Sequence, residues 1–255
     1  MWMRWWVAVL AVWGAACGES GESQLYEVVY TEGRSVCDDR NPQRNAYFGD
    51  THVHTGFSFD AYTQEVRTTP TDAYRFARGE QLLLPPLDTD GNGTTPVQLV
   101  MPLDFVAVTD HAEFFGEVQV CTDPSAPGYD SPECITFRAG RNPATFQFGI
   151  ELSGNNPSRF DFCDDREGGC FDQARGVWER TQEAAESAYD RSSRCEFTSF
   201  VAYEYSAATN VSNLHRNIIF RNSSVPSSPT SYYEQPSRSG LWRELDERCL
   251  EAGIA

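Results

Sequence analysis

Lysine is absent from this chain: all 20 basic residues are arginine, against 37 acidic residues. The formal net charge is −17 at pH 7, and so negative a field repels nucleic acid and anionic membrane surfaces. We therefore expect no nucleic-acid partner. Apolar content is ordinary at 40%, and the aromatic residues are numerous enough to build the core of a folded domain.

Two motifs of known chemistry are also missing. The sequence has no G-x-S-x-G, the strained turn that presents a catalytic serine, which disfavours a serine hydrolase. It has no C-x-x-C pair, a usual spacing in cysteine-rich metal sites. Its N-terminal apolar run, Trp5–Trp13, is too short to span a bilayer.

The first 17 residues have the pattern of a targeting segment. Arg4 precedes the apolar run, and the small residues 14–16 lead to Cys17. The pattern resembles a bacterial lipoprotein signal, in which Cys17 is lipidated and anchors an exported protein in the periplasm or at the outer membrane. The alternative is ordinary secretion with cleavage near Ala16. Residues 18–45 are expected to form a tether and N-terminal extension, with membrane contact only through Cys17.

The cysteine content agrees with export, because disulfides form in oxidising compartments. Cys121 with Cys134, and Cys163 with Cys170, are natural local pairs, but the sequence leaves the connectivity open. An odd number of cysteines follows Cys17, so at least one has no partner within the chain. Disulfides are favoured over a metal site for this set, which consists of Cys37, Cys121, Cys134, Cys163, Cys170, Cys195 and Cys249.

Apolar, β-branched runs predict strands, with segments of helical composition between them. Thr69 suits the cap of the first predicted helix, Pro70 its first turn and Gly79 its exit. Strands that alternate with helices predict an α/β fold, with ligands at the C-terminal ends of the strands. Strands are expected at 46–54, 103–111, 197–206 and 214–222, and helices at 69–80, at 173–194 and from about Ser239.

Two segments depart from this alternation. Residues 116–172 hold four cysteines and five prolines with little periodicity, and we expect a long insertion with short pieces of structure. Residues 87–96 contain D-x-D-x-N-G, with Asp88, Asp90 and Asn92 at the spacing of a calcium loop. Leu99 stands where such a loop has its bidentate glutamate, so a plain hairpin loop is the preferred interpretation.

All four histidines fall at the ends of predicted strands. His52 and His54 are two residues apart, so both point to one face of a strand, as two imidazole ligands of one metal require. His111 ends the second predicted strand, and His215 opens the fourth. Because strand ends converge in an α/β barrel, the four rings are expected to lie close together.

Glu204 stands in an apolar strand, where an unpaired carboxylate is costly. An ion pair with an arginine would satisfy it, and His215 could be a hydrogen-bonded residue at a strand end. Each alternative is reasonable alone. Taken with the pair His52 and His54, a metal cluster is the better interpretation.

The stretches "GDTHVHTGFSFDA", "DFVAVTDHAE", "VAYEYS" and "NLHRNIIFRN" resemble, in this order, the metal motifs of the PHP (polymerase and histidinol phosphatase) superfamily. With "PTDAYRFARGE" and "PLDFVAVTDHAEFFGE" they resemble more closely the exported bacterial proteins grouped as DUF3604. The resemblance covers residues 46–255. It implies a partial, distorted (β/α)7 TIM-like barrel with long disulfide-bearing loops, and two or three divalent ions of Zn, Mn or Fe.

The resemblance also implies roles for individual residues. His52 and His54 would hold the first metal, and Asp60 matches the aspartate that follows them, at a spacing one residue longer than the common one. His111 matches the histidine of the T-D-H motif. Asp110 would orient a ligand, Glu204 would bridge the metals, and His215 is the histidine that follows it. Related barrels often bridge their metals with a carboxylated lysine, so the absence of lysine leaves Glu204 as the bridge.

The expected function is metal-dependent hydrolysis of a small phosphorylated substrate, most simply a phosphoester. Adjacent divalent ions lower the pKa of a bridging water and bind the phosphoryl oxygens. Arg216 or Arg221 would bind phosphate, and Glu204 and Asp110 are the predicted catalytic residues. The alternative is a non-catalytic exported lipoprotein that binds a ligand on a PHP-like fold. No fifth histidine is present, whereas PHP proteins complete their cluster with a further His and Asp-x-His, so we expect residues 46–255 to be the N-terminal portion of a longer domain.

Overall fold

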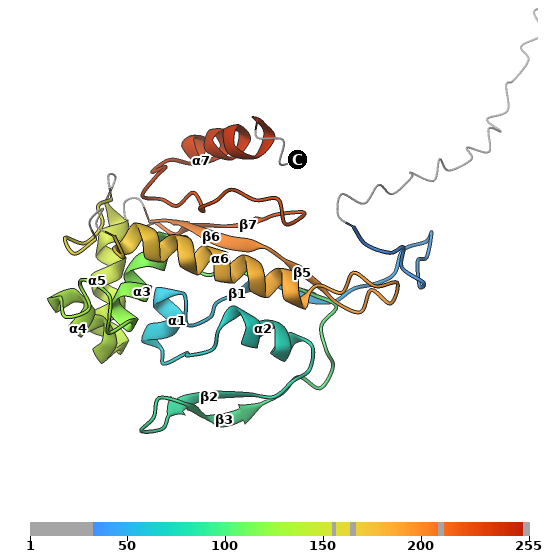
Figure 1. The fold of residues 1–255 in the computed structure, drawn as a ribbon, viewed down its shortest axis with the longest axis horizontal. Coiled ribbons are helices and arrows are strands. Elements are labelled where there is room, and N and C mark those ends of the chain that lie inside the picture. The colour runs from blue at the N-terminus through green and yellow to red at the C-terminus, as the bar shows by residue number, and fades with distance from the viewer. Residues whose placement is uncertain (1–32, 155–156, 164–166, 209–211, 252–255) are drawn as a thin grey trace, which may run out of the picture.

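The computed structural model describes residues 33–154, 157–163, 167–208 and 212–251 (Figure 1). The predicted signal peptide, with Cys17, and most of the predicted tether lie outside the described residues. Residues 33–45 are described and run beside the loop 190–196, where the backbone N–H groups of Ser35 and Asp38 donate to the carbonyls of Arg191 and Ser193.

In the described part of the chain, seven strands form three small sheets. The first sheet is parallel, and its central strand β4 has β1 on one side and β5 on the other. The second sheet is the hairpin β2–β3, and the third is the antiparallel pair β6–β7. The strands are β1 (Gly49–Val53), β2 (Leu82–Leu87), β3 (Gly93–Val97), β4 (Phe105–Val108), β5 (Thr198–Phe200), β6 (Ala202–Ala207) and β7 (Leu214–Ile219).

The architecture is mixed α/β, and the strands of the described residues do not close into a barrel. The predicted strand 197–206 is divided at Val201, so that β5 continues the parallel sheet while β6 turns away to pair with β7. A single bridge between His111 and Glu204 connects the end of β4 to β6. The predicted strand 214–222 forms as β7, but it runs antiparallel to its partner. Only residues 208–213 separate the two strands, too few for the crossover connection that a parallel pair needs.

The first predicted helix forms with the expected ends. Thr69 and Asp72 form a reciprocal capping box, Pro70 is the first helical residue, and Gly79 leaves the helix at φ +90°, where a Cβ would be strained. The last helix is capped by Ser237, not by Ser239. The helical segments are α1 (Phe59–Thr63), α2 (Pro70–Ala77), η1 (Ala112–Phe114), α3 (Phe115–Thr122), α4 (Pro132–Ala139), α5 (Arg141–Ser153), α6 (Cys170–Ala188), α7 (Arg238–Leu245) and η3 (Asp246–Glu251).

The segment 116–172 is more helical than expected, because it contains most of α3 and all of α4 and α5. Helix α3 buries residues on every side, which removes the polar stripe that marks a helix in sequence. It packs so closely on α6 that a Cβ at Gly116 would meet the Cys170 carbonyl oxygen at 2.0 Å. The hairpin interpretation of residues 87–96 is confirmed, since they connect and partly form β2 and β3.

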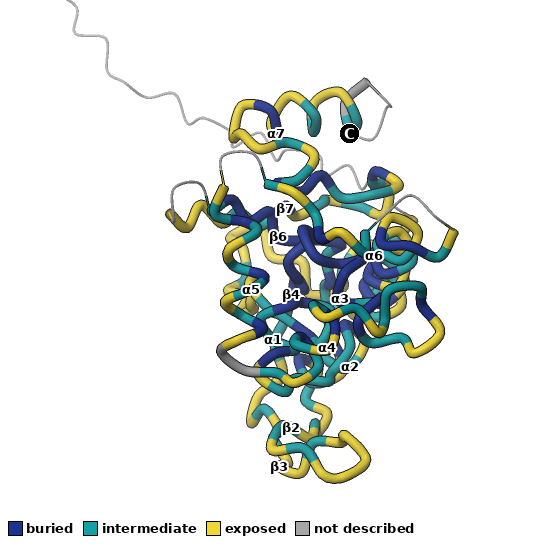
Figure 2. Tube along the Cα trace, turned by 90° about the vertical axis from the view of Figure 1, so that its left-hand side faces the viewer, coloured by how far each residue is buried: buried dark blue, intermediate teal, exposed yellow. Residues whose placement is uncertain are grey.

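The hydrophobic core lies between the parallel sheet, α3 and α6 (Figure 2). Trp178 of α6 is fully buried, and its indole N–H donates to the carbonyl of Pro226 at 2.8 Å. The rings of Phe114 and Phe148 pack with their centroids 4.7 Å apart and their planes tilted by 59°, and they extend the core toward α5. Strand β4 is buried on both faces from Val106 to Val108, which fixes its end, and the chain continues from there to Asp110 and His111, two of the predicted site residues.

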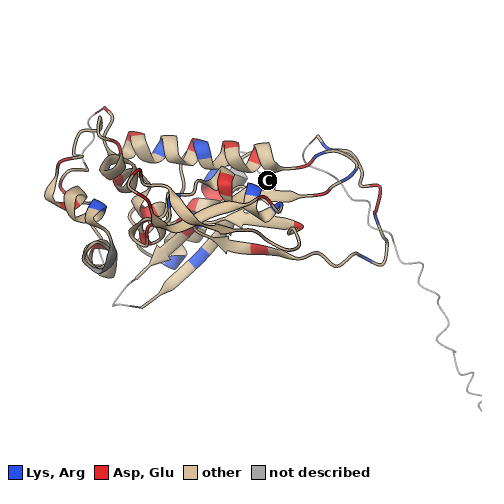
Figure 3. Cartoon of the chain, turned by 90° about the horizontal axis from the view of Figure 1, so that it is seen from below, with Lys and Arg blue, Asp and Glu red and all other residues tan. Residues whose placement is uncertain are grey.

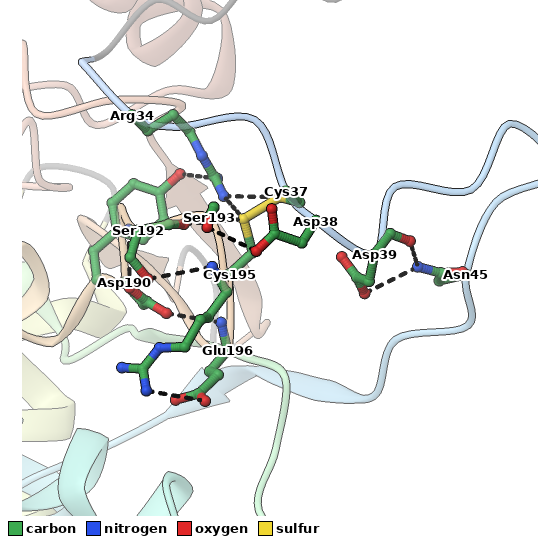
Figure 4. Close-up of a disulfide and its surroundings, with 12 residues drawn as sticks. Arg34, Cys37, Asp38, Asp39, Asn45, Asp190, Ser192, Ser193, Cys195 and Glu196 are labelled. Carbon is green, nitrogen blue, oxygen red and sulfur yellow. Dashed lines mark hydrogen bonds and ion pairs between the residues drawn. A yellow bond between two sulfur atoms is a disulfide. The ribbon is translucent and has the colours of Figure 1, made fainter.

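Three disulfides cross-link the described residues. The two local pairs, Cys121–Cys134 and Cys163–Cys170, both form. The third, Cys37–Cys195, joins residues 158 positions apart, and the Arg34 guanidinium lies against both of its sulfurs (Figure 4). Cys249 is free. Three disulfides indicate a protein of an oxidising, extracellular or periplasmic compartment.

Acidic positions occur on helices, strands and loops (Figure 3). Several of them meet arginine, as in the pair of buried Glu117 with Arg159 at 2.8 Å. Among the described residues, no helix has the length and apolar character that crossing a membrane requires.

Candidate metal centre

The first part of the centre is the end of β1. His52 and His54 project from one face with ring centroids 4.8 Å apart, while Val53 between them packs against the core. The Val53 carbonyl accepts a hydrogen bond from the Thr109 N–H at 2.8 Å, which ties this strand to the end of β4. The expected i, i+2 arrangement is therefore present.

The second part is the carboxylate of Glu204, which is fully buried on β6. One oxygen, Oε2, lies 2.8 Å from His54 Nε2, and 3.8 Å from both His52 Nε2 and His111 Nδ1. The other oxygen, Oε1, is in contact with His215 Nδ1. The four histidine rings therefore surround a single carboxylate.

The third part is Asp60, near the start of α1. Its carboxylate lies 3.1 Å from His54 Nδ1 and 3.7 Å from His111 Nε2. The Ser58 hydroxyl donates to it at 2.6 Å and accepts from the His111 backbone N–H at 3.2 Å. The added residue in the spacing between His54 and Asp60 thus does not keep Asp60 from the centre.

The six predicted ligands form three overlapping triads, within each of which the ligand atoms lie no more than 4.8 Å apart. Each of Glu204, His54 and His111 belongs to two triads, so the groups are one continuous cluster. The triads are His52, His54 and Glu204; His54, Asp60 and His111; and His111, Glu204 and His215.

The electrostatics of the centre favour positive charge. Burial lowers the pKa of His54, but its hydrogen bonds to Asp60 and Glu204 outweigh this effect and raise the pKa to about 10. Burial raises the pKa of both carboxylates, yet the histidine contacts hold them well below their usual range. Burial lowers the pKa of His111, which favours the neutral ring that binds metals.

Asp110 is hydrogen-bonded to the segments that carry two of the predicted ligands. It is fully buried, and its two oxygens accept hydrogen bonds from the Thr55 N–H and from the Thr55 hydroxyl, the latter at 2.7 Å. Burial raises the pKa of Asp110 to about 6, although the bonds from Thr55 oppose the shift. Its backbone carbonyl accepts from the Glu204 N–H at 3.0 Å. Asp110 therefore holds the segments that carry His54 and Glu204, and its role in orienting ligands stays a prediction.

We predict that Thr55→Val destabilises the protein by about 2 kcal/mol, because valine has the same shape but leaves a buried carboxylate oxygen without its donor. Urea titration would measure the loss. The control is Thr136→Val on α4, where an exposed hydroxyl donates to Pro132 and the expected loss is under about 0.5 kcal/mol. Equal losses in the two variants would contradict this role of Thr55.

Sequence reasoning missed Glu113, which is also fully buried. Its Oε1 accepts from the backbone N–H groups of Ser206 at 2.8 Å and Tyr232 at 3.0 Å, and burial raises its pKa to about 8 despite these bonds. The Ser206 hydroxyl in turn contacts His111 Nδ1 at 2.5 Å. The signal was present in the sequence, since a glutamate before Phe114 and Phe115 has the same cost of burial as Glu204.

The two predicted phosphate-binding arginines are not part of the cluster. Residues directly opposite each other in an antiparallel pair point to the same face. His215 is opposite Ser206 and Asn217 is opposite Glu204, so all four face the centre. Arg216 pairs with Tyr205 on the opposite face. Arg221 is exposed beyond the far end of β7, roughly 20 Å along the strand from His215. Substrate contact by either arginine stays a prediction.

Asn217 was also missed and is a neighbour of the centre. Its side-chain amide donates to the Thr51 carbonyl at 2.7 Å and lies 3.1 Å from His52 Nδ1. This contact fixes the ring of the most exposed histidine of the cluster and connects β7 to β1. No sequence signal distinguishes it from any other strand asparagine.

Fold and site together define an α/β protein with an extended histidine and carboxylate cluster where its parallel sheet meets an antiparallel pair. A family model described as "Protein of unknown function (DUF3604)" matches residues 41–255, and the chain belongs to that family. No curated protein and no solved structure matches the chain. The closer of the two resemblances seen in the sequence is therefore confirmed, and the wider one, to the PHP superfamily, stays a prediction.

Proposed function

We propose that the protein is a metal-dependent hydrolase of phosphoesters, with a PHP-like domain that uses two or three divalent ions of Zn, Mn or Fe. The observation that carries the proposal is the buried Glu204 carboxylate in contact with four histidines, which lie on or just after three strands. Export with a lipid anchor at Cys17 is part of the same proposal.

The residues present fit such a group of ions. Glu204 Oε1 is buried without a hydrogen bond of acceptable geometry, although it touches His215 Nδ1. A carboxylate oxygen in this position can share a cation with the ring. Imidazole and carboxylate donors in three adjoining triads suit Zn, Mn and Fe alike. His52, His54, Asp60, His111, Glu204 and His215 would hold the ions.

Bound divalent ions would supply a water of lowered pKa and a positive field for phosphoryl oxygens. The chain itself contributes position and charge. Asp60 and Glu204 fix the ring of His54 from both of its nitrogens, and Ser206 fixes that of His111. Glu204 and His111 are shielded from bulk solvent, whereas His52 and His215 are partly exposed and leave a side by which a substrate enters.

The proposal is tested by the double variant His52→Ala/His54→Ala. We expect the purified protein to bind more than one metal ion per chain, and the variant to lose at least one ion and all hydrolysis of p-nitrophenyl phosphate and bis(p-nitrophenyl) phosphate. Elemental analysis and release of nitrophenol measure both. Thr51→Ala is the matched control, because Thr51 is exposed on β1 and its side chain faces away from the centre.

Each result of this experiment has a distinct meaning. Unchanged metal content in the double variant would overturn the metal assignment. Metal content that depends on both histidines, in a protein that hydrolyses neither ester, would overturn the phosphoesterase and favour the exported ligand-binding module.

A further inference from the structure

A cavity of about 440 Å³ adjoins the centre along the edge of β1 that has no partner among the described strands. His52 and His54 belong to the wall of this cavity as well as to the cluster. We propose that the cavity binds an apolar group of the substrate, so that the substrate is an amphiphilic phosphoester with a neutral alkyl or aryl substituent. This inference rests on the proposed phosphoesterase function.

The hairpin β2–β3 forms the outer wall of the cavity and stands apart from the rest of the fold beside α2 (Figure 1). Its strands alternate in the expected way. Leu82, Leu84 and Val97 line the cavity, whereas Leu83 is 52% exposed on the other face. A row of inward apolar side chains along a cavity is a surface for an apolar ligand.

The inner wall has the same character. Val66, Phe76 and Leu103 continue the apolar lining from the loop before α2, from α2 itself and from the segment before β4. Apart from the two histidines, the one ionisable residue of the lining is Asp50. The lining includes no arginine, so the cavity suits a neutral group and not a second phosphate.

The position of the cavity decides between possible occupants. A phosphoryl group at the cluster would lie beside His52 and His54, and its substituent would extend either into solvent or into this cavity. The volume matches that of small-molecule sites, which are mostly apolar with a few polar groups. A substituent of a substrate held at the cluster can reach the cavity only if the cavity is open to His52 and His54, as it is here. A second protein copy could occupy a cavity that lies anywhere on the surface.

The test measures binding of methylphosphonate, butylphosphonate and octylphosphonate to the Mn²⁺-loaded protein by calorimetry. Burial of each methylene is expected to tighten binding about fourfold until the cavity is filled. Leu84→Asn should flatten this dependence on chain length and leave the affinity for methylphosphonate unchanged. Leu83→Asn, the neighbour on the outward face, should keep the full dependence and serves as the matched control.

Two failures are distinguishable. Equal affinity for all three phosphonates would overturn the cavity inference and leave the phosphoesterase intact, as would a dimer in solution that Leu84→Asn dissociates and Leu83→Asn does not. Absence of binding by every phosphonate, with metal content normal, would overturn the phosphoesterase and this inference with it.

Discussion

Replacing Glu204 with glutamine should lower the affinity of the centre for divalent metal at least 100-fold and abolish hydrolysis. Glutamine keeps the size of the side chain, but it replaces one acceptor oxygen with an NH2 donor and removes the one charge among the described residues that contacts all four histidines. A substitution that merely disturbs residues around a metal site typically costs 10–100-fold, and a shared ligand should cost more. Titration with Mn²⁺ followed by calorimetry measures the affinity directly.

Glu196→Gln is the matched control, because this carboxylate is exposed on the loop before β5 and its contact with Arg194 is 3.7 Å long. It should bind metal as the parent protein does. Circular dichroism and thermal unfolding establish that Glu204→Gln is folded before its affinity is compared. A folded Glu204→Gln protein with parental metal affinity would show that the carboxylate is not a ligand.

Removing the long disulfide by Cys37→Ser/Cys195→Ser should lower the free energy of unfolding by about 3–5 kcal/mol. The bond closes a loop with a sequence separation of 158, and the loop-entropy argument gives an upper value of about 5 kcal/mol for that length. It also holds residues 33–45 against the loop 190–196, where Ser193 donates to Asp38 at 2.7 Å. Urea titration under oxidising conditions measures the change.

The Cys163→Ser/Cys170→Ser pair is the comparison, because its separation is only 7 and the same argument gives about 2 kcal/mol. The order of the two losses is the informative result. If the short-loop variant lost more stability than the long-loop variant, chain entropy would not be the main contribution of these bonds.

The local features of the fold follow from the sequence because each depends on neighbouring residues. The capping box of Thr69 and Asp72, the exit at Gly79 and the two local disulfides are all short-range. The same is true of the pair His52 and His54, whose common face needs only the period of a strand. Their meeting with Glu204 needed the added argument that a buried carboxylate requires a partner.

The parts that sequence could not predict depend on how strands are paired. Residues 197–206 are divided at Val201, and β6 pairs antiparallel with β7. The strands therefore belong to two separate open sheets and do not continue one parallel sheet around a barrel. That pairing also turns Arg216 away from the cluster and brings Asn217 to His52. Helix α3 could not be predicted from the sequence, because it is buried on every side and lacks a polar stripe.

Among the described residues, the bridge between His111 and Glu204 is the one strand pairing that joins the parallel sheet to the β6–β7 pair. The six predicted ligands are divided along the same line. His52, His54, Asp60 and His111 come from the side of the parallel sheet, and Glu204 and His215 come from the β6–β7 pair. Ions held by both sides would cross-link the two sheets at the point where this single bridge joins them. Loading of the centre and cohesion of the domain are then linked equilibria, and the tighter the ions bind, the more firmly the two halves of the fold are joined.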